Sequence, residues 1–251
     1  MPVKARHTRL LMGSDGAGYA YDFSGVSNSL ETSLAIDSLE DTGFQSDRTF
    51  VAGDSKGDIK QAGYFHDSGA GSFEETLAEA MDGGDLLYVA ALYGTNAVAP
   101  NAAVAYVAPQ TNGSSIKLSA KVGNLITLDG GWGSGTGIVR GKLAGSGTIA
   151  ATGALDYIDL VAMGSDGGTA YLFVTTITGT ATNATITVQS DDNTSFTSPA
   201  TEGTFTFSDE GVYVVTMTGD VDRYIRLNCT SKGGATSFAV FGIVAVNGVT
   251  M

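Results

Sequence analysis

The chain has 251 residues, 43% of them hydrophobic and 16% charged, a composition that supports a packed core and disfavours global disorder. Its net charge is −13 and no basic face is apparent, which argues against binding nucleic acid from outside through the phosphates. The single cysteine, Cys229, excludes an intrachain disulfide, and its place on the apolar side of its segment predicts a small buried core residue.

Glycine is abundant, with 35 residues, and proline is scarce, with 4, which is typical of many short strands joined by glycine turns. Residues 1–20 predict an arm that is basic at its start and then rich in glycine. The first clear strand is expected over 29–39, because apolar positions such as Leu30 alternate with polar ones such as Glu31 and Asp37. We therefore expect an all-β chain with one short helix.

The middle of the first half combines a long polar segment with the helix signal. Residues 40–60 predict a long loop with few apolar anchors, and loops of this length are often functional. A returning strand is expected over 59–66. The helix is expected over 72–81, where Ser72 can cap the helix and Glu75 completes a capping box.

Asn112-Gly113 gives a strong hairpin turn signal further along the chain. It predicts a turn between strands over 102–108 and 115–122, preceded by a buried strand over 86–92. A strand over 138–143 is expected to close a first domain spanning 1–143. Residues 144–153, rich in glycine and small residues, are the linker candidate.

Residues 154–251 predict a second domain that is wholly β. Ala184, Ile186 and Val188 alternate with polar residues, which is the period of a half-buried strand. Several such segments at short spacing have the pattern of a small sandwich. Strands are expected over 157–163, 170–176, 184–189, 203–208, 212–217, 223–229 and 237–246.

Candidate catalytic residues are scarce. The two histidines, His7 and His66, lie in the arm and at a strand end, and with Cys229 they do not supply a zinc site. Asp191 and Asp192 are adjacent acids that could hydrolyse a glycoside in principle, but adjacent acids in a polar turn are usually only solvated. We expect a protein that is not an enzyme and that holds no cofactor or metal.

The stretch from Tyr21-Asp22-Phe23-Ser24-Gly25-Val26 to Tyr64-Phe65 resembles the tail tube family of siphophages. In that family a short apolar strand after an arm is followed by a second strand, a long polar loop, and a strand similar to residues 60–65. One short helix and further strands come next. The resemblance covers roughly residues 10–143 and depends on the order of the elements and on loose motifs.

The resemblance implies a tail-tube-like sandwich or barrel domain that self-assembles into six-membered rings. The rings stack into a tube whose inner strands form one continuous barrel, and DNA passes through without sequence-specific binding. Other tail proteins would join the tube ends. The protein would belong to the virion tail, be assembled in the host cytoplasm and carry no membrane anchor.

Within this resemblance, Glu31 and Asp37 are the candidates for the lumen, although an ordinary solvated face explains them as well. The helix would pack outside the barrel, while the 40–60 loop and the arm would reach neighbouring subunits or the next ring. The candidates for such contacts between subunits are Asp41, Phe44, Asp47, Arg48, Phe50, Asp54, Lys56 and Asp58.

The second domain resembles small sandwich modules of phage tail and capsid proteins, above all in its Arg223-Tyr224-Ile225-Arg226 strand. In a tube it would project outward. Two other functions stay open: a capsid decoration protein, and a carbohydrate-binding or adhesion module. The latter would stack sugar on Tyr171, Tyr213 or Tyr224. A plainer role for Arg223 and Arg226 is pairing with Asp220 and Asp222.

Overall fold

The computed structural model describes residues 8–41, 49–64, 87–94, 103–121, 124–134 and 137–248, and every regular element in these ranges is a β-strand. This confirms the all-β class, whereas the helix predicted over 72–81 lies outside the described residues. In chain order the strands are β1 Arg9–Ser14, β2 Gly16–Ala17, β3 Ala20–Asp22, β4 Ser27–Asp41, β5 Thr49–Tyr64, β6 Leu87–Gly94, β7 Ala103–Ser119, β8 Thr127–Ser134, β9 Val139–Ile149, β10 Gly153–Asp159, β11 Gly168–Thr178, β12 Ala184–Asp191, β13 Ala200–Phe207, β14 Gly211–Met217, β15 Tyr224–Ser231 and β16 Ser237–Val246.

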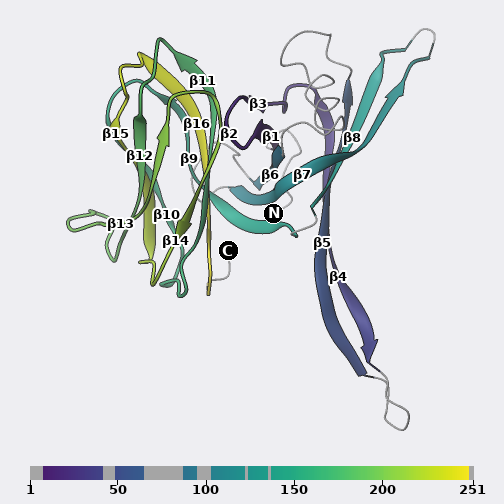
Figure 1. Cartoon of the computed structure of the whole chain (residues 1–251), viewed down its shortest axis with the longest axis horizontal. Helices are drawn as coiled ribbons and strands as arrows, with labels where there is room; N and C mark the ends of the chain where they lie inside the picture. Colours follow the sequence, from purple (N-terminus) through teal and green to yellow (C-terminus); the bar gives the residue numbers. More distant parts are fainter. Residues whose placement is uncertain are drawn as a thin grey trace.

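The strands form an 11-stranded sheet and a 4-stranded sheet (Figure 1). The larger one has two parts that share β7. Its curled part, here the curled sheet, has the order β14-β11-β16-β9-β7-β6-β1-β3, and its other part, here the hairpin sheet, has the order β4-β5-β8-β7. The separate small sheet has the order β10-β15-β12-β13.

The curled sheet bends until its two ends meet. Asp15 forms a parallel bridge with Val212 of β14, and the Gly18 amide donates to the Glu210 carbonyl at 2.8 Å. Gly211 has φ of 148° there, and a Cβ on it would lie 1.8 Å from the Gly16 oxygen, so only glycine fits this contact. The curled sheet thereby encloses a core that includes Leu92, Val107, Phe173 and Ile243.

Two further cores join the curled sheet to its neighbours. The small sheet packs on β14, β11, β16 and β9 through Phe205, Phe238 and other apolar residues, including Cys229, which is 2% exposed as predicted. The hairpin sheet packs on β1, β6 and β7 around the fully buried Trp132. The layers therefore run from the small sheet, through the two walls of the curled sheet, to the hairpin sheet, as Figure 1 shows from left to right.

The polar segment over 40–60 differs from the predicted loop. β4 extends to Asp41 and β5 begins at Thr49, and their register pairs Asp41 with Thr49 and Glu40 with Phe50. The loop prediction was wrong for most of its range because this hairpin projects from the body (Figure 1). Backbone hydrogen bonds alone can pair two strands, so a polar sequence without regular apolar alternation can form them and still look like a loop.

Residues 112–113 differ from prediction as well, because they form no hairpin turn. β7 runs through them: its first half pairs with β6 and β9, and residues 112–119 pair with β8. The register with β8 shifts between Gly113 and Ser115, which marks a bulge. The Asn-Gly signal therefore marks the place where one strand passes from one sheet to the other.

The range predicted as a linker, 144–153, is largely strand. β9 continues to Ile149 and pairs with β16 from Lys142 onward, while its start pairs with β7. A strand that pairs on both sides of the predicted boundary joins the two regions into one sheet. Glycine and small residues suit this stretch because the Leu155 side chain lies against Gly145.

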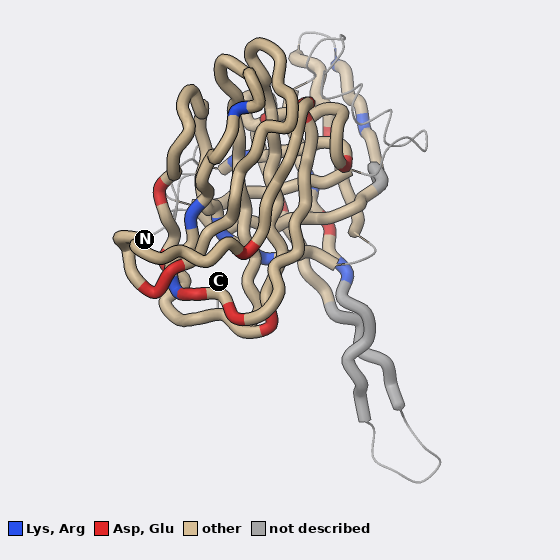
Figure 2. Tube along the Cα trace, turned by 60° about the vertical axis from the view of Figure 1, so that its left-hand side comes forward, with Lys and Arg blue, Asp and Glu red and all other residues tan. Residues whose placement is uncertain are grey.

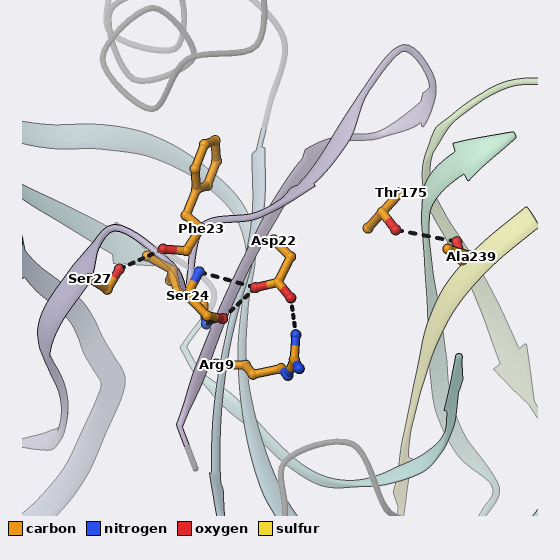
Figure 3. Close-up of polar contacts among 8 residues, drawn as sticks. Arg9, Asp22, Phe23, Ser24, Ser27, Thr175 and Ala239 are labelled. Carbon is orange, nitrogen blue, oxygen red and sulfur yellow. Dashed lines mark hydrogen bonds and ion pairs between the residues drawn. The ribbon is translucent and has the colours of Figure 1, made fainter. Parts of the chain in front are cut away.

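Part of the predicted arm is also ordered sheet, since β1 pairs with β6 and β3. The Asp22 carboxylate pairs with Arg9 and accepts a hydrogen bond from the Ser24 amide at 3.0 Å (Figure 3). The Arg9 guanidinium also lies 5.4 Å from the Phe241 ring centroid of β16. These contacts hold the start of the described chain against its last strand.

The Asp159–Arg223 pair predicts a pH effect on the sandwich. Arg223 donates two hydrogen bonds of 2.8 Å to Asp159, and these bonds chiefly lower the pKa of the carboxyl to about 2. Because the pKa is depressed on folding, the stabilisation is full above about pH 4 and is lost as the pH falls through 2. Thermal unfolding of the protein and of Asp159→Asn should differ at pH 5–7, with the difference vanishing near pH 2. A pH-independent difference would contradict this assignment.

Candidate subunit interface

The hairpin sheet has two edges that pair with no described residue. Among the described strands, β4 pairs with β5 alone along Ser27–Asp41. Residues 112–119 of β7 pair with β8 on one side and with nothing described on the other. Long strand edges of this kind present unpaired amides and carbonyls, which is the usual template for joining another chain.

The directions of these two edges are complementary. β4, β5, β8 and β7 alternate in direction, since each successive pair is antiparallel. β4 and the second half of β7 therefore run in opposite directions. If a second copy is related by rotation about an axis roughly along the strands, its β4 meets the free edge of β7 in antiparallel orientation. A contact of this kind is heterologous, and when it repeats head to tail it gives a ring if the rotation closes and an open filament if it does not.

One face of the hairpin sheet is polar. Apolar residues such as Ile59 and Leu128 point to the core, and the alternate positions point to solvent. Across the sheet, Glu31 lies opposite Lys60, and Lys117 lies opposite Asp129. Among the strand residues whose side chains are described, the charges of this polar face are balanced in number: Glu31, Asp58 and Asp129 against Lys56, Lys60 and Lys117.

The two ends of the hairpin sheet differ. At one end the β4–β5 hairpin projects, and at the opposite end lies the connection from β7 to β8 (Figure 1). Apolar side chains are exposed at that second end. This apolar tip consists of Tyr64, Leu118, Leu125 and Ile126, with exposed fractions of 44, 50, 68 and 45%. Exposed apolar side chains gathered at one place are typical of a contact surface.

The predicted assembly residues lie on or near this hairpin. Glu31, Lys56 and Asp58 are exposed on the polar face. Asp37 lies at a register shift between Ile36 and Ser38, so the simple alternation that grouped it with Glu31 is interrupted there. Asp41, Phe50 and Asp54 belong to the paired strands β4 and β5, whereas Phe44, Asp47 and Arg48 lie outside the described residues.

The predicted tyrosine face is corrected by the structure. Tyr171 is 3% exposed, and its ring packs at 6.0 Å from that of Tyr88 inside the curled sheet, so it offers no stacking surface. Tyr213 packs on the opposite side of that sheet, 5.6 Å from Phe207. Tyr224 lies on the small sheet. The three rings therefore do not share one face, because successive strand residues alternate between faces.

Sequence reasoning missed Lys60, Lys117, Asp129 and the free edge of β7. The sequence does contain a usable signal, because Ile116 and Leu118 alternate with Lys117 and Ser119, which puts Lys117 on a polar face. The partner strand was not predictable, because the assumed turn at Asn112-Gly113 paired this segment with the wrong neighbour.

The described residues offer little for catalysis or metal binding. No group of three or more His, Cys, Asp or Glu side chains there could hold a metal ion, and His7 and His66 lie outside them. Asp191 is 3% exposed and accepts hydrogen bonds from the amides of Asn193 and Ser198. Burial alone would raise the pKa of this carboxyl, but these bonds outweigh it and lower the pKa. Asp191 therefore organises its turn.

Arg223 and Arg226 also differ from the plainer expectation that Asp220 and Asp222 neutralise them. Arg223 pairs with Asp159, and the Arg226 Nε donates to the Gln189 side chain at 2.9 Å. In the described part of the chain no helix is long and apolar enough to cross a membrane.

No family model and no curated protein matches the chain. Solved structures do. The tail tube of SPP1 is similar at 14% identity and a TM-score of 0.44, covering 55% of this chain and 78% of its own. A chain in the virion of a native gene transfer agent particle is similar at 13% identity and a TM-score of 0.37, and the match covers 52% of this chain and 94% of that one. The SPP1 Dit protein, described as a hub of the adsorption apparatus, is similar at 11% identity and a TM-score of 0.33, and the match covers 93% of this chain and 98% of Dit.

These solved structures are of tail tube and other tail proteins. A sheath–tube complex of an extracellular contractile injection system is also similar, at 8% identity and a TM-score of 0.42. At these identities the likeness concerns the fold.

Proposed function

We propose that this chain is the structural subunit of a phage tail tube and has no catalytic activity. Copies join through the free edges of β4 and β7 into rings of six, the number that the sequence resemblance implies. The rings stack into a tube that carries DNA. The subunit is assembled in the host cytoplasm and retained in the virion tail, with other tail proteins at the tube ends.

The observation that carries this proposal is the pair of free, oppositely directed edges on one sheet. A rotation joins them without any change in either strand, and closure removes both edges from solvent. The polar face of the hairpin sheet then lines the channel, because its other face is occupied by the Trp132 core. Glu31 lies on this face, as the sequence resemblance implies for the lumen.

The arrangement along the tube axis supports stacking. The projecting β4–β5 hairpin and the apolar tip lie at opposite ends of the same sheet, so that each ring presents one to the other. The small sheet and the hairpin sheet lie on opposite sides of the curled sheet (Figure 1), so in the proposed tube the small sheet would point away from the channel. This position agrees with the proposed outward projection of the second region, 154–251.

The charges suit a channel through which DNA moves. Lys and Arg are scattered along the described chain, with no continuous basic face (Figure 2). On the polar face, lysines alternate with acids at cross-strand positions. A lining without net attraction lets a polyanion pass without being held, since phosphate binding depends on uncompensated cations.

The test is the assembly state of the purified full chain. Light scattering and negative-stain electron microscopy should show rings and hollow tubes as protein concentration and salt increase. Monomers in every condition would contradict the proposal. Gold-labelled antibody on the particle separates the tube from a capsid decoration protein, since label on heads instead of tails would also contradict it.

A further inference from the structure

The outer face of the small sheet carries a group of aromatic and guanidinium side chains that tube formation does not use. Ile225, Leu227 and Cys229 of β15 point into the sandwich core, so Tyr224 and Arg226 point outward. Register places Tyr157 of β10 and Gln189 of β12 on either side of Arg226.

A folded turn builds part of this face. The Asp191 carboxylate binds the Asn193 amide at 3.1 Å, the Asn193 side chain at 2.6 Å and the Ser198 amide at 3.2 Å. The turn carries Phe196 back onto the sheet, where it is 7% exposed with φ of 47°. A left-handed conformation is unusual for phenylalanine, and here the hydrogen bonds around it maintain it.

The rings and the guanidinium groups form one continuous layer, here the aromatic shelf, consisting of Tyr157, Phe196, Tyr224 and Arg226. Tyr157 lies 6.1 Å from Phe196 and 5.7 Å from Tyr224, between ring centroids. The Arg226 guanidinium lies 4.1 Å above the Phe196 ring. Phe196 is covered, whereas the Tyr157 ring is 40% exposed.

The guanidinium of Arg226 is available to pair with an acidic ligand. Arg223, Arg226 and Lys232 are the only cationic residues after Lys142. Arg223 is neutralised by Asp159, and Lys232 donates to backbone carbonyls. The Arg226 Nε donates to the Gln189 side chain, and Arg226 forms no ion pair within the described residues. All of its neighbours on the shelf belong to the described residues. Its remaining donors suit a carboxylate.

We propose that the aromatic shelf binds an acidic saccharide unit, with the exposed Tyr157 ring against the apolar face of the sugar and Arg226 on its carboxylate. The Tyr224 ring stands at 89° to that of Tyr157 and would meet the edge of the sugar. The shelf consists of four residues, whereas a stable protein interface uses about 20–30 residues on each side, so the shelf fits a small ligand better than a protein partner. A chain of net charge −13 with one free cation at the site disfavours a nucleic acid. Binding at one shelf does not require ring formation, whereas a tube would repeat the site along its exterior and raise avidity.

The experiment is a titration of the full chain with an oligosaccharide of hexuronic acid units and with the same oligosaccharide after its carboxyl groups are reduced to alcohols. Saturable binding of the acidic form, at least tenfold tighter than the reduced form, is expected. Arg226→Gln and Tyr157→Ala should each weaken it at least tenfold, and Arg226→Lys should retain part of it.

Thr206→Ala is the matched control, because Thr206 is exposed on β13 of the same sheet, outside the shelf, and it should bind as the unchanged protein does. Thermal unfolding checks that each variant is folded. The proposal is overturned if neither oligosaccharide binds, if both forms bind equally, or if Arg226→Gln and Tyr157→Ala leave binding unchanged. Binding of a protein or nucleic acid to the shelf in place of the saccharide would overturn it too.

Discussion

A proline in the middle of β4 is expected to convert assembled protein into folded monomers. In an antiparallel pair, successive residues direct their amides alternately toward the partner strand and away from it. Ser33 lies opposite Asp58 and Leu34 opposite Gly57, so one of these two amides faces β5 and the other faces the free edge. Proline at the outward-facing position removes a donor from the proposed ring contact without breaking the hairpin.

We therefore expect that one of Ser33→Pro and Leu34→Pro keeps a melting temperature close to that of the unchanged protein but forms at least about tenfold fewer rings. The other variant should lose stability. Light scattering measures the ring fraction, and circular dichroism measures unfolding. Val214→Pro and Val215→Pro are the matched controls at the edge of β14: one of the two amides faces β11, so that variant should lose stability, and the other variant should stay folded without reducing ring formation. Normal rings from both β4 variants would contradict the edge-to-edge contact.

Loss of the apolar tip is expected to leave rings but shorten or abolish tubes. At the end of the hairpin sheet, Leu118, Leu125 and Ile126 have exposed fractions of 50, 68 and 45%. Burying such a side chain from full exposure is worth roughly 1.5–3 kcal/mol, and these side chains, already about half buried, would gain roughly half of that each. The proposed stacking repeats this gain in every subunit of the ring. The triple variant Leu118→Ser, Leu125→Ser, Ile126→Ser should therefore sediment as single rings.

The matched control changes exposed apolar residues outside the hairpin sheet. Val161 and Met163 are 73% and 56% exposed, and serine at both should leave tube length unchanged. Electron microscopy gives the length distribution for each protein. If the tip variant forms tubes of ordinary length, the apolar tip does not contribute to stacking. If it forms no rings, the two surfaces are not separable in the proposed way.

The strands could be predicted from sequence wherever one of their faces is buried. β12 and β16 follow the predicted ranges closely, because their inward residues pack in the sandwich core. The predicted strands match β4 and β5 only in the part near the body of the protein. Beyond it the sequence has no regular period of two, so nothing in it distinguishes these strands from a loop.

Strand pairing was less predictable than strand existence. Asn112-Gly113 is a genuine local signal, but tertiary pairing with β8 and β6 decided that the chain continues straight through a bulge. The 144–153 segment was misread for a related reason, since glycines chosen for close packing look like those of a linker.

In the candidate interface too, the face of a strand was predictable and the pairing of strands was not. Glu31 was placed on a polar face by alternation alone, and the structure agrees with that placement. The balancing lysines and the β7 edge were missed because they depend on which strands meet. Tyr171 was predicted on a ligand face because the sequence does not show which face of a strand is covered. β11 lies between β14 and β16 and both of its faces are covered, so Tyr171 is buried.

The most direct test of the proposed assembly is a cryo-electron microscopy map of the assembled full chain at side-chain resolution. The predicted result is residues 112–119 of one subunit paired antiparallel with β4 of the next, with Glu31 and Lys60 lining the channel. A map in which β4 is exposed to solvent, or in which subunits meet through the small sheet, would contradict it.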